Sequence, residues 1–136
     1  MDTLSVEQKA RILIVQDDPV MLGLVCGSLR PDGHLIIEMD SPSDALRIGA
    51  AEFQNIDLVV TSINTRPISG IELAKRLARK GVDAPMLFIT PTHSLAVVIA
   101  NSLGHSAVIE LPFSGAELRT AVRKCLAVRR RKYVKD

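Results

Sequence analysis

The stretch Arg11–Pro19 constrains the fold more than any other part of the chain. The apolar run Ile12–Val15 leads into Asp17 and Asp18, and Pro19 follows at once. An unbroken apolar run of this length predicts a strand buried on both faces, as in a parallel sheet. Asp18 before Pro19 is typical of a helix start. We therefore expect two carboxylates at the carboxyl end of a buried strand, where open α/β sheets bind ligands.

Strand and helix patterns alternate along the rest of the chain, and Ser114 with Glu117 forms a capping box before the last helix. The predicted strands are 11–15, 35–39, 57–62, 85–90 and 107–110, and the predicted helices are 20–29, 42–53, 71–80, 95–103 and 115–131. Strict alternation of this kind gives a parallel sheet with helices on both faces. The sequence therefore predicts an α/β fold, a flavodoxin-like, doubly wound five-stranded parallel sheet, (βα)5, with strand order 2-1-3-4-5.

The 136 residues are 47% hydrophobic, which excludes a disordered chain and fits one domain. We expect a polar N-terminal extension over 1–9, the domain over 10–130 and a basic C-terminal tail over 131–136. No secretion signal or membrane-spanning run is visible, so a cytoplasmic location without a membrane partner is expected. Cys26 and Cys125 lie on apolar helical faces and are interpreted as buried, reduced core thiols.

Other polar features carry less information. His34, His93 and His105 have no metal-ligand spacing with one another or with cysteine. The basic run Arg129–Lys132 could contact nucleic acid or acidic partners, but we interpret it as a solvated helix end or the start of a linker. No helix-turn-helix pattern follows it, so no sequence-specific nucleic-acid binding is expected.

Five landmarks then fall in order along the chain. They are the acid pair Asp17-Asp18, the third-strand end Asp57 to Asn64, Gly70, Thr90 and Leu111-Pro112-Phe113. Together they resemble the receiver domain of a response regulator over roughly residues 10–130. The resemblance implies a role in two-component, or phosphorelay, signal transduction, in which a histidine kinase passes a phosphoryl group to an aspartate of the receiver. It also implies a cis peptide bond between Leu111 and Pro112.

The chain departs from this family where the chemistry takes place. The family's phosphorylated aspartate lies eight residues before the loop glycine, and counting back from Gly70 leads to Ser62. The family's lysine precedes the Pro-Phe pair, where this chain has Leu111, and its switch aromatic lies three residues earlier, at Val108. The family positions that this chain retains are Asp17, Asp18 and Thr90.

These departures predict a weakened magnesium site. The resemblance assigns metal binding to the second acid, the phosphorylated aspartate and a backbone carbonyl two residues later. This leaves Asp18 and the carbonyl of Asn64, with Asp17 able to help through water, so no cofactor is required and Mg²⁺ would bind weakly at most. Ser62 is expected to hydrogen-bond Asp18 or a backbone group. It would accept a phosphoryl group only if Asp17 or Asp18 removed its proton.

The loss of the family's aspartate at position 62 and the loss of its lysine at position 111 compensate each other in charge. Removing one partner of a buried ion pair leaves an uncompensated charge that costs roughly 3–5 kcal/mol, whereas replacing both partners is often neutral. Serine at 62 together with leucine at 111 amounts to such a paired replacement. We therefore expect a stable fold without the family's phosphoryl chemistry, and Val108 has no aromatic ring with which to switch.

The sequence thus indicates a pseudo-receiver: a protein-interaction module and not an enzyme. Its expected partners are a histidine kinase or a downstream effector, bound through the fourth helix, fifth strand and fifth helix. A homodimer is a further possible assembly. One alternative is residual phosphotransfer through Ser62, with a weak metal site at Asp17 and Asp18. A further alternative is a small-ligand or nucleotide-binding flavodoxin-like domain, but no glycine-rich phosphate loop follows the first strand.

Overall fold

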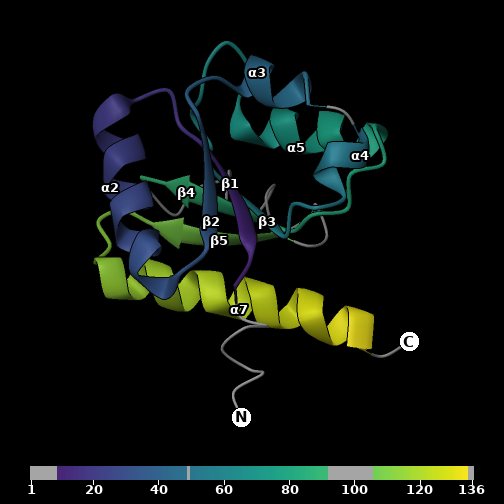
Figure 1. Cartoon of the computed structure of the whole chain (residues 1–136). Coiled ribbons are helices and arrows are strands. Elements are labelled where there is room, and N and C mark those ends of the chain that lie inside the picture. The colour runs from purple at the N-terminus through teal and green to yellow at the C-terminus, as the bar shows by residue number, and fades with distance from the viewer. Residues whose placement is uncertain (1–8, 49, 92–105, 135–136) are drawn as a thin grey trace.

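The five strands lie side by side in one parallel sheet with the order β2-β1-β3-β4-β5 (Figure 1). The structure is a computed structural model that describes residues 9–48, 50–91 and 106–134. The strands are β1 (Arg11–Val15), β2 (Leu35–Met39), β3 (Leu58–Ser62), β4 (Met86–Thr90) and β5 (Ser106–Glu110). The predicted flavodoxin-like topology is confirmed.

The helices cover both faces of this sheet. In Figure 1, α2 and α7 lie against one face, and α3, α4 and α5 lie against the other. The helices are α2 (Pro19–Leu29), the 3-10 turn η1 (Arg30–Asp32), α3 (Pro42–Leu46), α4 (Ala50–Phe53), α5 (Gly70–Arg79) and α7 (Gly115–Val134). The helix predicted over 95–103 lies outside the described residues. Among the helices that are described, none is long and apolar enough to cross a membrane.

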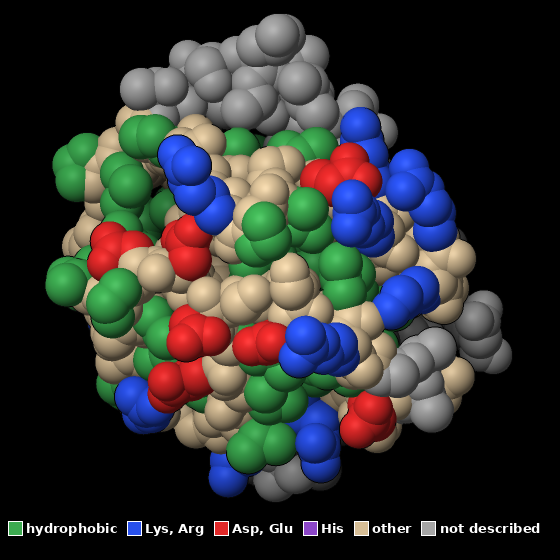
Figure 2. All heavy atoms as spheres, turned by 90° about the horizontal axis from the view of Figure 1, so that it is seen from above, with side chains coloured by type: hydrophobic (Ala, Val, Ile, Leu, Met, Phe, Trp, Pro, Cys, Tyr) green, Lys and Arg blue, Asp and Glu red, His purple; other side chains and the backbone are tan. Residues whose placement is uncertain are grey.

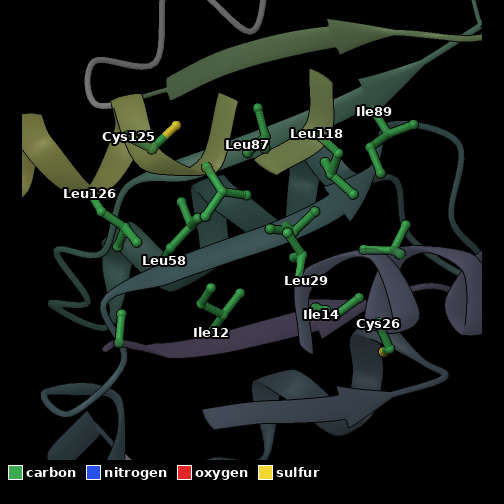
Figure 3. Close-up of a cluster of buried hydrophobic side chains, with 14 residues drawn as sticks. Ile12, Ile14, Cys26, Leu29, Leu58, Leu87, Ile89, Leu118, Cys125 and Leu126 are labelled. Carbon is green, nitrogen blue, oxygen red and sulfur yellow. The ribbon is translucent and has the colours of Figure 1, made fainter. Parts of the chain in front are cut away.

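The core consists of two apolar clusters separated by the sheet. Side chains of β1 alternate between them: Ile12 and Ile14 face α2 and α7, whereas Leu13 and Val15 face α3 and α5. Figure 3 shows the first cluster, in which Leu29 of α2 and Leu118 of α7 meet the strands. Burial on both faces explains why β1 reads as a continuous apolar run in the sequence.

The two cysteines are free and buried, as the sequence predicts. Burial, reinforced by the neighbouring Glu38, raises the pKa of the Cys26 thiol to about 11. Burial also raises the pKa of the Cys125 thiol to about 11. Both side chains therefore stay protonated near neutral pH and contribute to the apolar packing.

The local signals for helix ends are confirmed by their hydrogen bonds. The Asp18 carboxylate caps α2 by accepting from the backbone N–H of Val20 at 3.0 Å. At α7, the Ser114 hydroxyl accepts from the Glu117 N–H at 3.0 Å, and the Glu117 carboxylate accepts from the Ser114 N–H at 2.7 Å. Gly81 follows α5 with a φ of 83°, a conformation that favours glycine.

Several boundaries differ from the prediction, most of them by one residue. The single helix expected over 42–53 is divided into α3 and α4, because Arg47 and Ile48 donate to carbonyls three residues back, at 3.1 and 3.3 Å, and thereby close α3 in a tight turn. Asp57 precedes β3 instead of belonging to it, and its carboxylate accepts from the Arg11 N–H at 2.9 Å. The last helix continues past the expected end at Arg131 to Val134.

The capping box makes a direct stability prediction. Replacing Ser114 by alanine leaves the Glu117 N–H without its acceptor and should lower the free energy of unfolding by about 1 kcal/mol. Chemical denaturation measures this change, with Ser43→Ala as the control, since the Ser43 backbone and not its hydroxyl takes part in the α3 cap. Equal losses in the two variants would contradict the assignment.

Candidate site at the carboxyl edge of the sheet

The candidate site lies where β1, β3 and β4 end together. Val15 is in register with Thr61, and Ser62 is in register with Ile89, so the carboxyl ends of these three strands meet at one edge of the sheet. The side chains that follow or end these strands form what we call the strand-end site. Its members are Gln16, Asp17, Asp18, Ser62 and Thr90.

Ser62 forms its hydrogen bond with Gln16. The Ser62 hydroxyl donates to Gln16 Oε1 at 2.9 Å, across 46 residues of sequence. The partner expected from the sequence, Asp18 or a backbone group, is thus replaced by an amide. Gln16 continues β1, and its backbone N–H donates to the Met39 carbonyl at 3.0 Å. This geometry directs the Ser62 proton to a neutral oxygen.

Gln16 is the site residue that the sequence reasoning missed. Its side chain is 1% exposed, although it is polar and lies at the end of an apolar strand. Its Nε2 is buried and has no hydrogen-bond partner among the described protein atoms. An unpaired buried donor carries a desolvation penalty, so the bond to Ser62 is the compensation that this amide receives. A polar residue directly before the acid pair was the available signal.

The two acids serve different parts of the backbone. The Asp17 carboxylate accepts from the Arg66 N–H at 2.9 Å and so ties the end of β1 to the loop before α5. The Asp18 carboxylate is engaged in the cap of α2. Both residues are exposed. The adjacent acids therefore diverge, and each stabilises a backbone N–H on a different side of the strand end.

This donor set fits a tight magnesium site poorly. Mg²⁺ prefers carboxylate oxygens, whereas the groups that meet at the end of β3 are the neutral Gln16 amide and Ser62 hydroxyl. Within the described ranges, no three His, Cys, Asp or Glu side chains are grouped to hold a metal ion. Asn64 is exposed in the loop after β3.

Leu111, which the sequence assigns to the family's lysine position, lies at the margin of the apolar core. Leu111 is partly buried and packs against the cluster beneath α2 and α7. Its backbone N–H donates to the carbonyl of Thr90 at 2.8 Å, and Thr90 itself is 2% exposed. The peptide bond between Leu111 and Pro112 is cis, as expected. Val108, at the switch position, packs against the opposite cluster. An apolar side chain therefore occupies each of these positions.

Gly70 has a steric role at the same edge. Its N–H donates to the Ile63 carbonyl at 2.9 Å, which brings the start of α5 against the end of β3. A Cβ at this residue would lie 2.2 Å from the Ser62 carbonyl oxygen. The loop landmark is thus a glycine because the two backbones approach too closely for any side chain.

Comparisons with known proteins agree with this architecture. The model of the response regulator receiver domain family matches residues 12–123. Transcriptional regulatory protein SpaR of Bacillus subtilis is 34% identical over 127 residues, which cover 90% of this chain and 54% of SpaR. Transcriptional regulatory protein TcrA of Mycobacterium tuberculosis is 30% identical over 115 residues, which cover 83% of this chain and 44% of TcrA. The chain thus spans about half the length of these curated relatives.

A solved structure shows the same fold. The crystal structure of a signal receiver domain from Vibrio parahaemolyticus superposes with a TM-score of 0.82 at 17% identity. The match covers 94% of this chain and 98% of that one. At this identity the likeness concerns the fold alone.

The close approach at Gly70 predicts a large effect of one methyl group. Gly70→Ala must displace the loop from β3 and should lower the free energy of unfolding by about 1–3 kcal/mol. Gly27→Ala is the matched control, because a Cβ there meets nothing within 4 Å. In dilute solution this control should gain roughly 0.5–1 kcal/mol of stability. Urea unfolding measures both, and an unchanged Gly70→Ala variant would contradict the steric role.

The bond between Gln16 and Ser62 predicts a coupled pair. Ser62→Ala leaves the buried amide oxygen unpaired and should cost about 1–3 kcal/mol of stability. Gln16→Met combined with Ser62→Ala removes both partners and should cost less than the two single changes added together. A double-mutant cycle by denaturant unfolding measures the coupling. Strict additivity would show that the bond contributes nothing to the folded state.

Proposed function

Because the chain belongs to the response regulator receiver family, we propose that it is a receiver that acts through protein contacts and without phosphorylation of its own. The family places it in two-component signalling, where receiver domains are signalling modules and not classical enzymes. The observation that carries the proposal is the hydrogen bond from Ser62 to Gln16. It occupies the hydroxyl that stands in the phosphoacceptor position.

The chemistry of this hydroxyl supports the proposal. A serine becomes nucleophilic when an adjacent base removes its proton. Here the proton is donated to an amide oxygen, which is not basic, while the Asp17 and Asp18 carboxylates accept from backbone N–H groups elsewhere. Residual phosphotransfer through Ser62 would require its hydroxyl to exchange Gln16 Oε1 for a carboxylate oxygen of Asp17 or Asp18.

The apolar side chain at the lysine position supports the proposal further. Phosphoryl transfer depends on cationic groups that stabilise the charge on the transferred oxygens. The lysine position holds Leu111, whose side chain packs with apolar neighbours. Receiver domains typically use Mg²⁺ for phosphorylation; here we place at most a weak Mg²⁺ site at Asp17, Asp18 and the carbonyl of Asn64. No cofactor is required for the proposed role.

The proposed signalling surface includes β5 and the start of α7. Every residue of β5 is partly exposed, in contrast to the fully buried β4 beside it. The sequence also assigns the helix over 95–103 to this surface, outside the described residues. With Val108 at the switch position, the surface would be presented constantly to a kinase or a downstream effector. Relatives such as SpaR and TcrA are transcriptional regulatory proteins.

The proposal predicts that the chain gains no phosphoryl group from a small donor. Incubation with acetyl phosphate and Mg²⁺, followed by intact-mass measurement, should leave the mass of the wild-type chain and of Ser62→Ala unchanged. The double variant Ser62→Asp with Leu111→Lys restores the acceptor and the cation that the family uses, and it should gain one phosphoryl group. This variant shows that the donor is active on the same scaffold.

One result would overturn the proposal. A stable adduct on the wild-type chain that disappears in Ser62→Ala would identify a serine-accepting receiver. Loss of that adduct without Mg²⁺, and in Asp17→Asn and Asp18→Asn, would then assign a metal site to these two acids.

A further inference from the structure

The surface helix α2 carries no charged residue and is apolar on every side. Its inner side is buried through Val25, Cys26 and Leu29, but Val20 is 78% exposed and Leu24 is 51% exposed. Helices that are hydrophobic all round are typical of buried positions. Figure 2 shows hydrophobic side chains gathered on the side where α2 lies in Figure 1, with acidic side chains next to them.

Two glycines adjoin these exposed side chains: Gly23 lies between Val20 and Leu24, and Gly27 follows Leu24 by three residues. A Cβ at Gly23 or at Gly27 would meet nothing within 4 Å, and neither residue has a positive φ. Within the described part of the chain, no turn or close contact therefore requires glycine at these positions. Glycine inside a helix lowers its stability relative to alanine. The pair weakens α2 without an internal benefit.

The four residues form one stripe along the helix. Val20, Gly23, Leu24 and Gly27 are spaced at i, i+3, i+4 and i+7, so they share a face, which we call the α2 face. Val20 and Leu24 project from it, and the two glycines leave hollows beside them. Small residues at such spacing allow two helix backbones to approach closely. The face is therefore complementary in shape to a copy of itself.

The charges at the two ends of α2 favour one orientation. Asp17 and Asp18 are exposed at its N-terminal end. The Arg30 side chain at its C-terminal end is 57% exposed and forms an ion pair with Glu38 of the same chain, so a partner's Asp17 would join this pair. In an antiparallel pair each acidic end lies next to the partner's arginine, and the helix dipoles oppose each other. A single register places Asp17 opposite Arg30, Val20 opposite Gly27, and Gly23 opposite Leu24.

We propose that the α2 face pairs two copies of this chain, antiparallel about a two-fold axis between the residues 23 and 24 of each copy. Such an isologous contact uses one patch twice. It is independent of Ser62 and of the surface formed by β5 and α7. The last helix is a weaker candidate for self-association, because its described apolar side chains, from Leu118 to Leu126, already pack beneath the sheet.

The test is the oligomeric state of the full chain at increasing concentration, measured by sedimentation velocity. We expect a dimer that becomes more abundant with concentration, and a monomer for Leu24→Glu. Leu35→Glu is the matched control: Leu35 is also 51% exposed, but the alternation of β2 places it on the sheet face opposite α2. This control should dimerise like the wild-type chain, and circular dichroism verifies that both variants fold.

Gly27→Gln separates pairing from folding. Glutamine favours a helix in the single chain and fills the hollow, so the Tm in dilute solution should rise while the dimer dissociates about tenfold more readily or more. A destabilised fold would change both quantities in the same direction. A chain that stays monomeric at all concentrations, or a dimer that persists in Leu24→Glu, would overturn the proposal.

Cysteine cross-linking tests the orientation. Mixed Val20→Cys and Gly27→Cys chains should form a disulfide-linked pair under mild oxidation, whereas Val20→Cys alone should not. The native Cys26 and Cys125 are buried and give little background. Cross-linking of Val20→Cys to itself would show a parallel arrangement and overturn the antiparallel register.

Discussion

Burial of β1 on both faces is the constraint on which the rest of the structure depends. Its side chains enter both apolar clusters, so helices must cover the sheet on each side. Where β1 ends, the chain passes from the core to the solvent in one step, because Gln16 is buried and Asp17 is exposed. Polar groups at this transition need hydrogen-bond partners, and the side chains of the strand-end site find most of theirs among one another and in nearby backbone N–H groups.

Those partners show how a receiver scaffold can remain stable with other side chains. An isolated buried charge is costly, whereas a neutral pair that satisfies its own hydrogen bond is not. The Gln16–Ser62 pair is neutral and satisfies the Gln16 Oε1 acceptor, which leaves only the buried Nε2 without a described partner. Leu111 directly follows β5 at the same edge and packs against the apolar cluster. The remaining carboxylates lie at the exposed rim, where the backbone N–H groups of Arg66 and Val20 engage them. This arrangement is the physical basis of the phosphorylation-independent role that we propose.

Most element boundaries could be predicted because their causes are local. Asp18-Pro19, Ser114 with Glu117, and Gly81 each determine a helix end through residues a few positions away. The Gln16–Ser62 and Asp17–Arg66 bonds could not be predicted in this way, since they join residues 46 and 49 positions apart. Their partners depend on the exact position of two strand ends. The break after α3 also escaped prediction, because the apolar period continues through the turn at Arg47.

The α2 face illustrates a different limit of sequence reasoning. The sequence of a uniformly apolar helix indicates that one side of it is buried. It does not reveal which side this is, or that another apolar side is exposed to solvent. The structure supplies this by placing Leu29 in the core and Val20 in solvent. Asp18 then links the two parts of the molecule, because the carboxylate that caps α2 belongs to the acid pair of the strand-end site. Asp18, one of the acid pair, therefore stabilises the first turn of the helix that we propose as the contact between two copies of the chain.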